Sequence, residues 1–131
     1  MIEKDSNGGL ESGRGLPLEP LSPQVFAVLL ALGDGDRHGY AIMKEVEEKT
    51  RGEVVLLPGS LYTAIRRMLE SGWIEEVESR EGEDPRRRVY GLTEQGRELA
   101  LTEARRMSTL LRVAVEKDLA PPTLIPAPRR P

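Results

Sequence analysis

The chain has 131 residues, of which 19 are Lys or Arg and 22 are Asp or Glu, and its formal net charge is −3. A length of this order is typical of one domain with a modest core. The single His and the lack of Cys exclude disulfides, zinc sites with Cys ligands, thiol nucleophiles and most His-based triads. We therefore expect neither an enzyme nor a protein with a metal or another cofactor.

The chain shows no segment that would direct it into or across a membrane. Its longest apolar run, residues 25–32, spans eight residues, whereas a helix that crosses a bilayer needs about 20. The first five residues have neither the basic nor the apolar region of a signal peptide. We therefore expect a cytoplasmic protein without a membrane partner.

Both ends of the chain have compositions typical of disorder. Residues 1–20 are rich in Gly and Pro without a hydrophobic period, and residues 120–131 hold five of the ten prolines. Such segments bury too little apolar surface to offset the entropy that they lose on ordering. We expect a disordered N-terminal tail, a Pro-rich disordered C-terminal tail, and a folded unit between them.

Three short helices are predicted in the first half of the folded unit. Ser22 and Pro23 supply an N-cap and a first helical residue for a helix that is apolar on almost every side. A second helix is expected over residues 39–49 and a third over residues 60–71, with Gly72 after its last turn. The second and third have apolar stripes at helical spacing, so the three helices can share one core.

The hydrophobic period then changes to that of strands. Residues 73–79 and 87–92 predict a hairpin with a polar tip. Thr93 is an N-cap for a last helix over residues 94–119, which is longer than this small core can cover. Its apolar residues follow a heptad spacing that requires a second helix, and a second copy of the chain is the economical partner. The predicted dimer interface consists of Ala100, Ala104, Met107, Leu110, Leu111, Ala114 and Val115.

This order of elements is that of a winged helix-turn-helix followed by a dimerisation helix. We predict a mainly α fold with a small β-hairpin, in which residues 21–93 form the winged-helix domain and residues 94–119 the dimerisation helix. In such a fold the third helix enters the major groove of double-stranded DNA, the hairpin contacts the backbone or the minor groove, and a dimer binds an inverted repeat. The predicted DNA-binding residues are Ser60, Tyr62, Thr63, Arg66 and Arg67 on the helix and Arg80, Arg86, Arg87 and Arg88 on the hairpin.

The placement of charge supports this interpretation, although the net charge is acidic. Residues 60–71 together with 86–88 carry five Arg and one Glu, a local positive excess that suits phosphates. An Arg can also form a bidentate hydrogen bond with guanine. A second interpretation stays open, in which the winged helix is a protein-interaction module without specific DNA binding.

Several motifs in series resemble the PadR family of bacterial transcriptional regulators. They are, in chain order, His38-Gly39-Tyr40, Pro58-Gly59-Ser60-Leu61-Tyr62, Ile65-Arg66-Arg67-Met68, Ser71-Gly72-Trp73-Ile74, Val89-Tyr90-Gly91-Leu92-Thr93 and Gly96-Arg97. The resemblance covers about residues 22–115. It implies a homodimeric winged-helix repressor whose third helix and wing bind operator DNA, whose last helix dimerises, and which a small hydrophobic or phenolic effector releases.

The sequence departs from the family pattern in the third helix. Ser60 and Thr63 stand where the family commonly has Thr and Pro, a difference that bears on base preference and not on the fold. A single helix follows the wing, as in the shorter subfamily.

A possible calcium loop has a second, structural interpretation. Asp34, Asp36, His38, Gly39 and Glu45 fit the spacing of such a loop, but an imidazole stands where Ca²⁺ requires oxygen, so we favour a turn before the second helix and no metal.

Three apolar or aromatic residues also have structural interpretations. Trp73 and Met107 are expected to pack in the core and the dimer interface, and they are also the candidates for an effector pocket. Tyr40 is expected to pack into the core.

Overall fold

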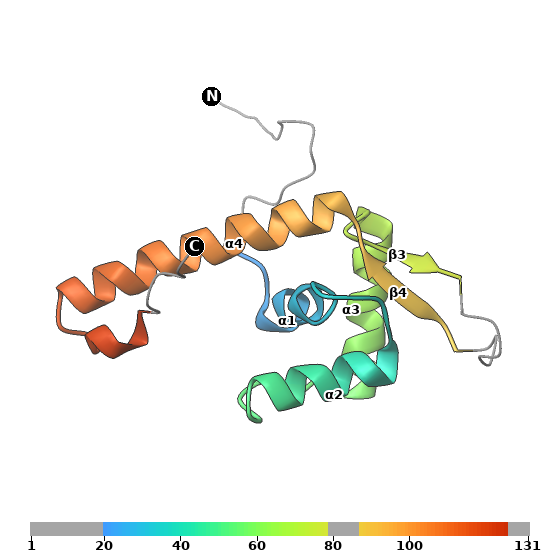
Figure 1. Ribbon diagram of the computed structural model, residues 1–131, viewed down its shortest axis with the longest axis horizontal. Helices are drawn as coiled ribbons and strands as arrows, with labels where there is room; N and C mark the ends of the chain where they lie inside the picture. The colour runs from blue at the N-terminus through green and yellow to red at the C-terminus, as the bar shows by residue number, and fades with distance from the viewer. Residues whose placement is uncertain (1–19, 79–86, 126–131) are drawn as a thin grey trace.

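A computed structural model describes residues 20–78 and 87–125 (Figure 1). The predictions for residues 1–19, 79–86 and 126–131, which include Arg80 and Arg86, lie outside the described residues. The described elements are α1 (Pro23–Ala31), β2 (Arg37–His38), α2 (Gly39–Lys49), α3 (Pro58–Ser71), β3 (Ile74–Val77), β4 (Val89–Leu92), α4 (Glu94–Glu116) and the 3-10 turn η1 (Pro122–Leu124). The predicted mainly α fold with a small sheet and a long last helix is confirmed.

Helix α1 is the centre of the core. The Ser22 hydroxyl accepts a hydrogen bond from the Val25 N–H at 3.2 Å, which caps the helix as its sequence predicts. The helix lies between α4 and α2 in Figure 1 and packs against α2, α3 and α4. Ala27, Val28, Leu29 and Ala31 are therefore buried within the chain, whereas Leu30 is 56% exposed.

Helix α3 begins earlier than its apolar stripe indicates. We expected it to start at Ser60, but Pro58 and Gly59 form its first turn. Pro fits the first helical position because its fixed φ is already helical and because the N–H that it lacks would have no partner there. The helix ends as predicted, with Gly72 at a φ of 80°, a left-handed conformation that favours glycine.

The sheet has one strand more than the predicted hairpin. Its order is β2-β4-β3, all antiparallel, with Ile74 opposite Leu92 and Val77 opposite Val89. The third strand, β2, has only two residues, too few to show an alternation in sequence. It ties the loop before α2 to the base of the wing.

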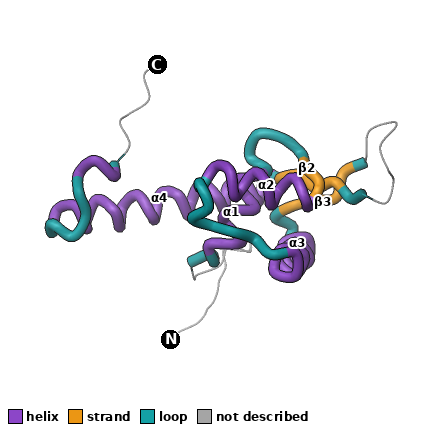
Figure 2. The backbone as a smooth tube through the Cα atoms, turned by 90° about the horizontal axis from the view of Figure 1, so that it is seen from below, coloured by secondary structure: helices purple, strands orange, loops and turns teal. Residues whose placement is uncertain are grey.

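Helix α4 is anchored at its start and extends beyond the core. The Thr93 hydroxyl accepts from the Gly96 N–H at 3.0 Å and lies 2.7 Å from the Gly72 carbonyl oxygen, to which it donates. Only Gly96, Leu99 and Glu103 are buried on this helix, all in its first half. Its second half projects past the other helices (Figure 2). Residues 122–124, in the expected Pro-rich tail, form the turn η1.

Among the described residues, no helix combines the length and the apolar character that crossing a membrane requires.

Candidate nucleic-acid interface

The outer face of α3 carries all five residues that we predicted on this helix. Leu61, Ala64, Ile65 and Met68 are buried. The residues between them, Ser60, Tyr62, Thr63, Arg66 and Arg67, are exposed. The face therefore presents hydroxyls and two guanidinium groups together, over about two helical turns.

Neither arginine of this face contacts an acidic group among the residues that the structure describes. Within the described part of the chain, Arg66 and Arg67 have no ion pair or hydrogen bond of their side chains, whereas Arg37, Arg88 and Arg106 each contact a carboxylate. Two exposed guanidinium groups without a carboxylate partner are available to a ligand with acceptor groups, such as a phosphate or a base edge.

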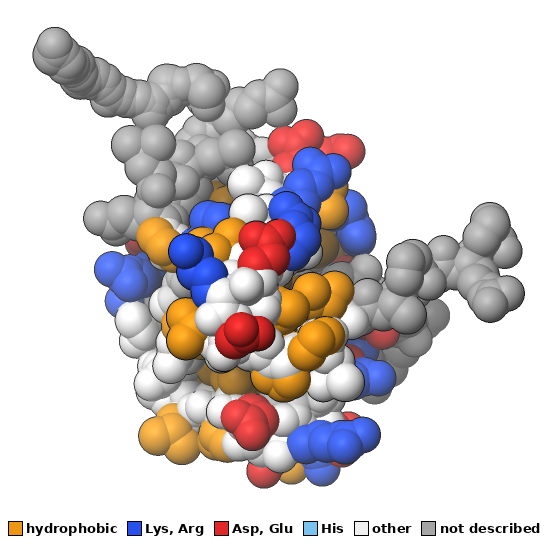
Figure 3. Space-filling model, turned by 90° about the vertical axis from the view of Figure 1, so that its left-hand side faces the viewer, with side chains coloured by type: hydrophobic (Ala, Val, Ile, Leu, Met, Phe, Trp, Pro, Cys, Tyr) orange, Lys and Arg blue, Asp and Glu red, His pale blue; other side chains and the backbone are white. Residues whose placement is uncertain are grey.

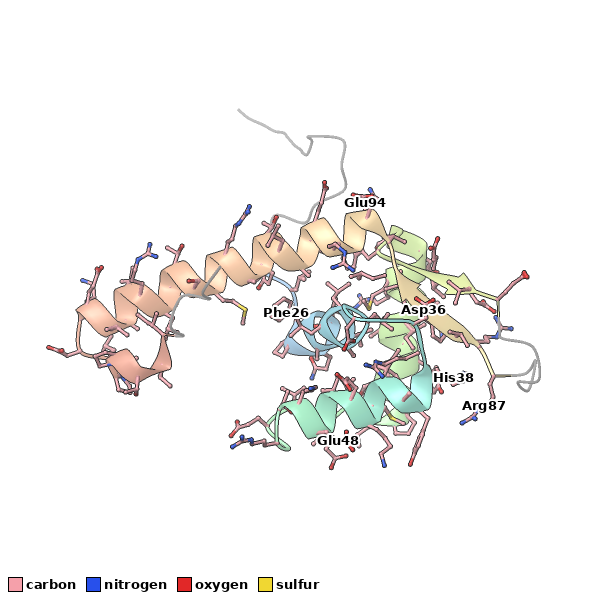
Figure 4. All side chains as sticks on the ribbon, viewed as in Figure 1. Phe26, Asp36, His38, Glu48, Arg87 and Glu94 are labelled. Atoms are coloured by element: carbon pink, nitrogen blue, oxygen red, sulfur yellow. The ribbon has the colours of Figure 1, made fainter. Side chains whose placement is uncertain are left out.

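The wing places two more arginines beside this face. Arg87 and Arg88 precede β4 and are exposed. Arg88 pairs with Glu76 of β3 at 3.1 Å, but both side chains are well exposed, so this ion pair is weak. Figure 4 shows Arg87 and His38 at the same end of the molecule, where the wing meets the start of α2.

A hollow of about 230 Å³ joins the wing, α2 and α3. It is lined by His38, Gly39, Tyr40, Tyr62, Arg87, Arg88 and Tyr90. A Cβ on Gly39 would lie 2.6 Å from the Tyr62 hydroxyl oxygen, so a larger residue would force this phenol to shift from its place against the start of α2. The motif His38-Gly39-Tyr40 was visible in the sequence, but the role of Gly39 depends on a contact that sequence spacing does not reveal.

Tyr40 does not pack into the core, and that prediction was wrong. Its side chain is 57% exposed, and the Lys44 ammonium lies 5.9 Å from the centre of its ring. Its place on α2, next to buried Gly39 and at the edge of the hollow, turns it outward. Tyr40 thus belongs to the candidate interface, which sequence reasoning missed.

Tyr90 is the buried tyrosine of this hollow. Its burial raises the pKa of the phenol above the ordinary value, and the nearby carboxylate of Glu76 raises it further. The phenol therefore keeps its proton at neutral pH.

Two of the acidic residues with calcium-loop spacing, Asp34 and Glu45, are part of a structural network around Arg37. Arg37 donates to the Ala31 carbonyl at 2.8 Å and to Asp34 at 3.0 Å, and it lies 3.5 Å from Glu45. It thereby holds the end of α1 against α2. Within the described residues, no three His, Asp or Glu side chains are grouped to hold a metal ion.

The predicted dimer interface on α4 is only partly covered. Ala104, Met107 and Leu110 are exposed, whereas Ala100, Leu111, Ala114 and Val115 are half-buried. In Figure 3, which views the end of the molecule where α4 projects, hydrophobic side chains are exposed among charged ones.

The same helix carries a buried ion pair that sequence reasoning missed. Glu103 is only 7% exposed and pairs with Arg106 one turn later. The heptad pattern gave no signal for it, because it reports apolar positions only.

The two candidates for an effector pocket lie apart. Trp73 packs against the core, and its carbonyl oxygen is in contact with the start of α4 at Gly96. Met107 follows Gly96 by 11 residues, about 16 Å along the helix. One protomer therefore does not bring the two side chains together.

Comparisons with known proteins agree with this architecture. An uncharacterized 37.1 kDa protein in transposon TN4556 of Streptomyces fradiae is 41% identical over 83 residues, which are 63% of this chain but only 22% of that protein. The fold is similar to that of a PadR family transcription regulator from Clostridium difficile, with a TM-score of 0.61, 24% identity, and coverage of 76% of this chain and 100% of that chain.

A second solved structure shares the fold and is a complex with DNA. Bacillus subtilis PadR in complex with operator DNA has a TM-score of 0.53 and 23% identity, with coverage of 61% of this chain and 46% of that chain. The model of the transcriptional regulator PadR-like family matches residues 28–102, more than half of the 131 residues. The chain therefore belongs to the PadR-like family of transcriptional regulators.

Proposed function

We propose that this protein is a homodimeric repressor that binds an inverted-repeat operator in double-stranded DNA and is released by a small hydrophobic or phenolic effector. The observation that carries the proposal is the outer face of α3. This face carries two arginines that have no carboxylate partner among the described residues. The wing places Arg87 and Arg88 beside the face.

DNA suits this surface because the surface offers hydrogen-bond donors. Guanidinium groups and hydroxyls bind phosphate oxygens, and an arginine on the outermost part of a helix can reach the acceptors of guanine in the major groove. The exposed tyrosines beside the wing, Tyr40 and Tyr62, add hydroxyl donors along the path of the DNA backbone. The structure of the Bacillus subtilis relative with operator DNA supports the same use of this fold.

Dimerisation is supported by the half of α4 that projects beyond the core. Met107 and Leu110 are large apolar side chains exposed to water; Met107 lies in the row with heptad spacing, and Leu110 flanks this row. Pairing with a second copy would bury them and would place two α3 helices on one side of the dimer. Such a dimer binds two half-sites about 34 Å apart, or a multiple of this distance.

The effector proposal follows from the same arrangement. Because Trp73 and Met107 lie apart in one protomer, a pocket that uses either of them near an apolar interface would be completed by the partner's α4. A ligand bound there would alter how the two arms, which are the second halves of α4 (residues 106–116), pack together, and hence the spacing of the two α3 helices. This is how an effector would lower affinity for the operator.

Selection of bound sequences from a random DNA pool tests the proposal most directly. The expected result is an inverted repeat, with weaker retention in the presence of some members of a panel of aromatic compounds. Fluorescence anisotropy with the selected duplex then compares the wild type with an Arg87→Ala, Arg88→Ala double variant, which should bind all sequences more weakly and with a smaller salt dependence.

A matched control is Arg105→Ala, which removes an exposed arginine from α4 at a distance from α3. Its affinity for DNA should equal that of the wild type. A pool from which no sequence is enriched would contradict the assignment, and stable capture of a protein partner instead would favour an interaction module.

A further inference from the structure

The outer face of α3 is divided into a ridge and a flank. Residues 59, 63, 66 and 70 follow the spacing of four, three and four that keeps side chains in one row, and this row lies opposite the buried residues of the helix. Arg66 belongs to this ridge. Arg67 is turned by about 100° from Arg66 and lies in line with Ser60, two turns before it.

The flank that carries Arg67 meets α1 across a hollow of about 380 Å³. Its polar lining consists of Ser22 and Gln24 at the start of α1 and Ser60, Thr63 and Arg67 of α3. No residue that lines it is acidic. The Ser22 oxygen accepts from the Val25 N–H, so its hydroxyl hydrogen is available to a ligand.

In a duplex bound at this surface, the two arginines would consequently face different parts of the DNA. A helix in the major groove, which is about 12 Å wide, turns its outermost row toward the base edges and its flanks toward the phosphates of the two strands. Adjacent residues on one helix cannot both point at the floor of the groove. Arg66 would then be directed to the floor and Arg67 to one wall.

We infer that the hollow between α1 and α3 holds a backbone phosphate of the DNA, bound by Arg67 with Gln24 and Ser60, whereas Arg66 reads a base. The inference rests on the proposed DNA binding and divides it between two neighbouring residues. Gln24 and Ser22 become part of the DNA interface, although α1 is otherwise a core helix.

Binding isotherms over a range of salt concentrations separate the two roles. Each variant is measured with the selected operator duplex and with a scrambled duplex. Arg67→Ala should weaken binding to both duplexes by the same factor and reduce the slope of log K against log salt by about one. Arg66→Ala should lower affinity for the operator about 5- to 150-fold more than affinity for the scrambled duplex.

Conservative variants sharpen the distinction. A lysine is a point charge that binds phosphate well but lacks the planar fork of arginine. Arg67→Lys should therefore retain the affinity and the salt slope of the wild type, whereas Arg66→Lys should lose discrimination between the two duplexes. Gln24→Glu, which places a carboxylate in the hollow, should weaken binding to both duplexes more than Gln24→Ala does.

Ethylation of single phosphates in the operator locates the contact. One ethylated phosphate should impair binding of the wild type but not of Arg67→Ala, because the variant has already lost that contact. All these side chains are exposed, so circular dichroism spectra should match that of the wild type.

The division is overturned if Arg66→Ala and Arg67→Ala change specificity and salt slope alike, or if Arg67→Lys fails where Arg66→Lys succeeds. This outcome leaves DNA binding itself intact. A wild-type protein that prefers no duplex at any salt concentration overturns the proposed function and the division with it.

Discussion

The two ends of the molecule differ in how they satisfy their apolar side chains. At one end, α1, α2, α3 and the sheet enclose a core in which Leu61, Met68 and Ile42 are completely buried. At the other, the second half of α4 leaves Met107 and Leu110 in water. The first end buries its apolar side chains within the chain. The second exposes apolar side chains, as protein–protein interfaces do before their partner binds. The core and the proposed dimer interface thus lie in different parts of one chain.

The largest effect is expected in the core. Leu61→Ala removes a side chain with 0% exposure and should lower the free energy of unfolding by about 2–5 kcal/mol, because it leaves a cavity. Urea denaturation followed by circular dichroism measures this change. Leu57→Ala, at an exposed position just before α3, should cost less than about 0.5 kcal/mol. Equal costs for the two variants would show that the core is not where we place it.

A charge introduced on the exposed apolar side of the arm should weaken dimerisation. Leu110 is 57% exposed in one protomer, so Leu110→Arg should leave the helix content unchanged. An arginine in the proposed seam should weaken the dimer by about 3 kcal/mol, more than 100-fold in Kd. Light scattering should then report a monomer at concentrations where the wild type is a dimer, and Leu111→Arg should act alike. A dimer mass for both variants would refute the seam.

The buried ion pair lies where the two regions meet. Arg106→Met leaves the Glu103 carboxylate without its partner and should destabilise the protein by about 1–2 kcal/mol, a value that is limited because Arg106 is itself partly exposed. Thermal unfolding compares it with Arg105→Met, an exposed neighbour that should change little. A null result for Arg106→Met would mean that water already reaches Glu103.

Two similar helix ends allow a matched comparison of the regions. Helix α2 ends with Arg51 at a φ of 53° and α4 with Asp118 at 61°, both in the left-handed region that disfavours these residues. Arg51→Gly and Asp118→Gly should each remove this backbone strain and stabilise the helix end by about 0.5–1 kcal/mol.

The stabilisation should appear in a different measurement at each of the two sites. For Arg51→Gly it should raise the global free energy of unfolding, because α2 belongs to the core. For Asp118→Gly it should instead slow hydrogen exchange of the Leu119 N–H, which bonds to the Ala114 carbonyl at 2.8 Å. A global gain from Asp118→Gly in the Leu110→Arg monomer would show that the arm unfolds together with the core.

The smallest effect concerns pH. Burial raises the pKa of Tyr90, so the folded chain keeps this proton at pH values where the unfolded chain has lost it. The contribution to stability is therefore complete below the ordinary pKa of 10.0 and is lost as pH rises through the folded value. Tyr90→Phe should show a shallower loss of stability above pH 10 than the wild type, and parallel profiles would exclude this phenol as the cause.

Most of the fold could be predicted because its signals are local. Ser22 and Thr93 cap their helices through hydroxyls a few residues from the N–H groups that they accept from, and Gly72 ends α3 through its own backbone freedom. The two-residue strand β2 could not be predicted in this way. It exists because β4, about 50 residues later, offers an unpaired edge, and no local pattern records that pairing.

The candidate interface was predicted in part for the same reason. The exposed side of α3 follows from helical spacing, which identifies Arg66 and Arg67 but does not say what each faces. Sequence reasoning did not place Tyr40 and Gln24 in the candidate interface. Their proposed roles depend on neighbours that are distant in sequence, the Tyr62 phenol and the flank of α3. A pattern within one helix cannot report the groove that it forms with another.

Gly96 sets the direction in which the arm leaves the core. A Cβ at this position would overlap the carbonyl oxygen of Trp73 and come within 2.9 Å of Leu92, so α4 starts in direct contact with the end of the sheet. In the proposed dimer, the direction of the two arms determines the distance between the two α3 helices. The lack of a side chain at Gly96 then sets the distance between the two operator half-sites. A larger residue at this position should change the preferred spacing of the half-sites and leave the preferred base sequence unchanged.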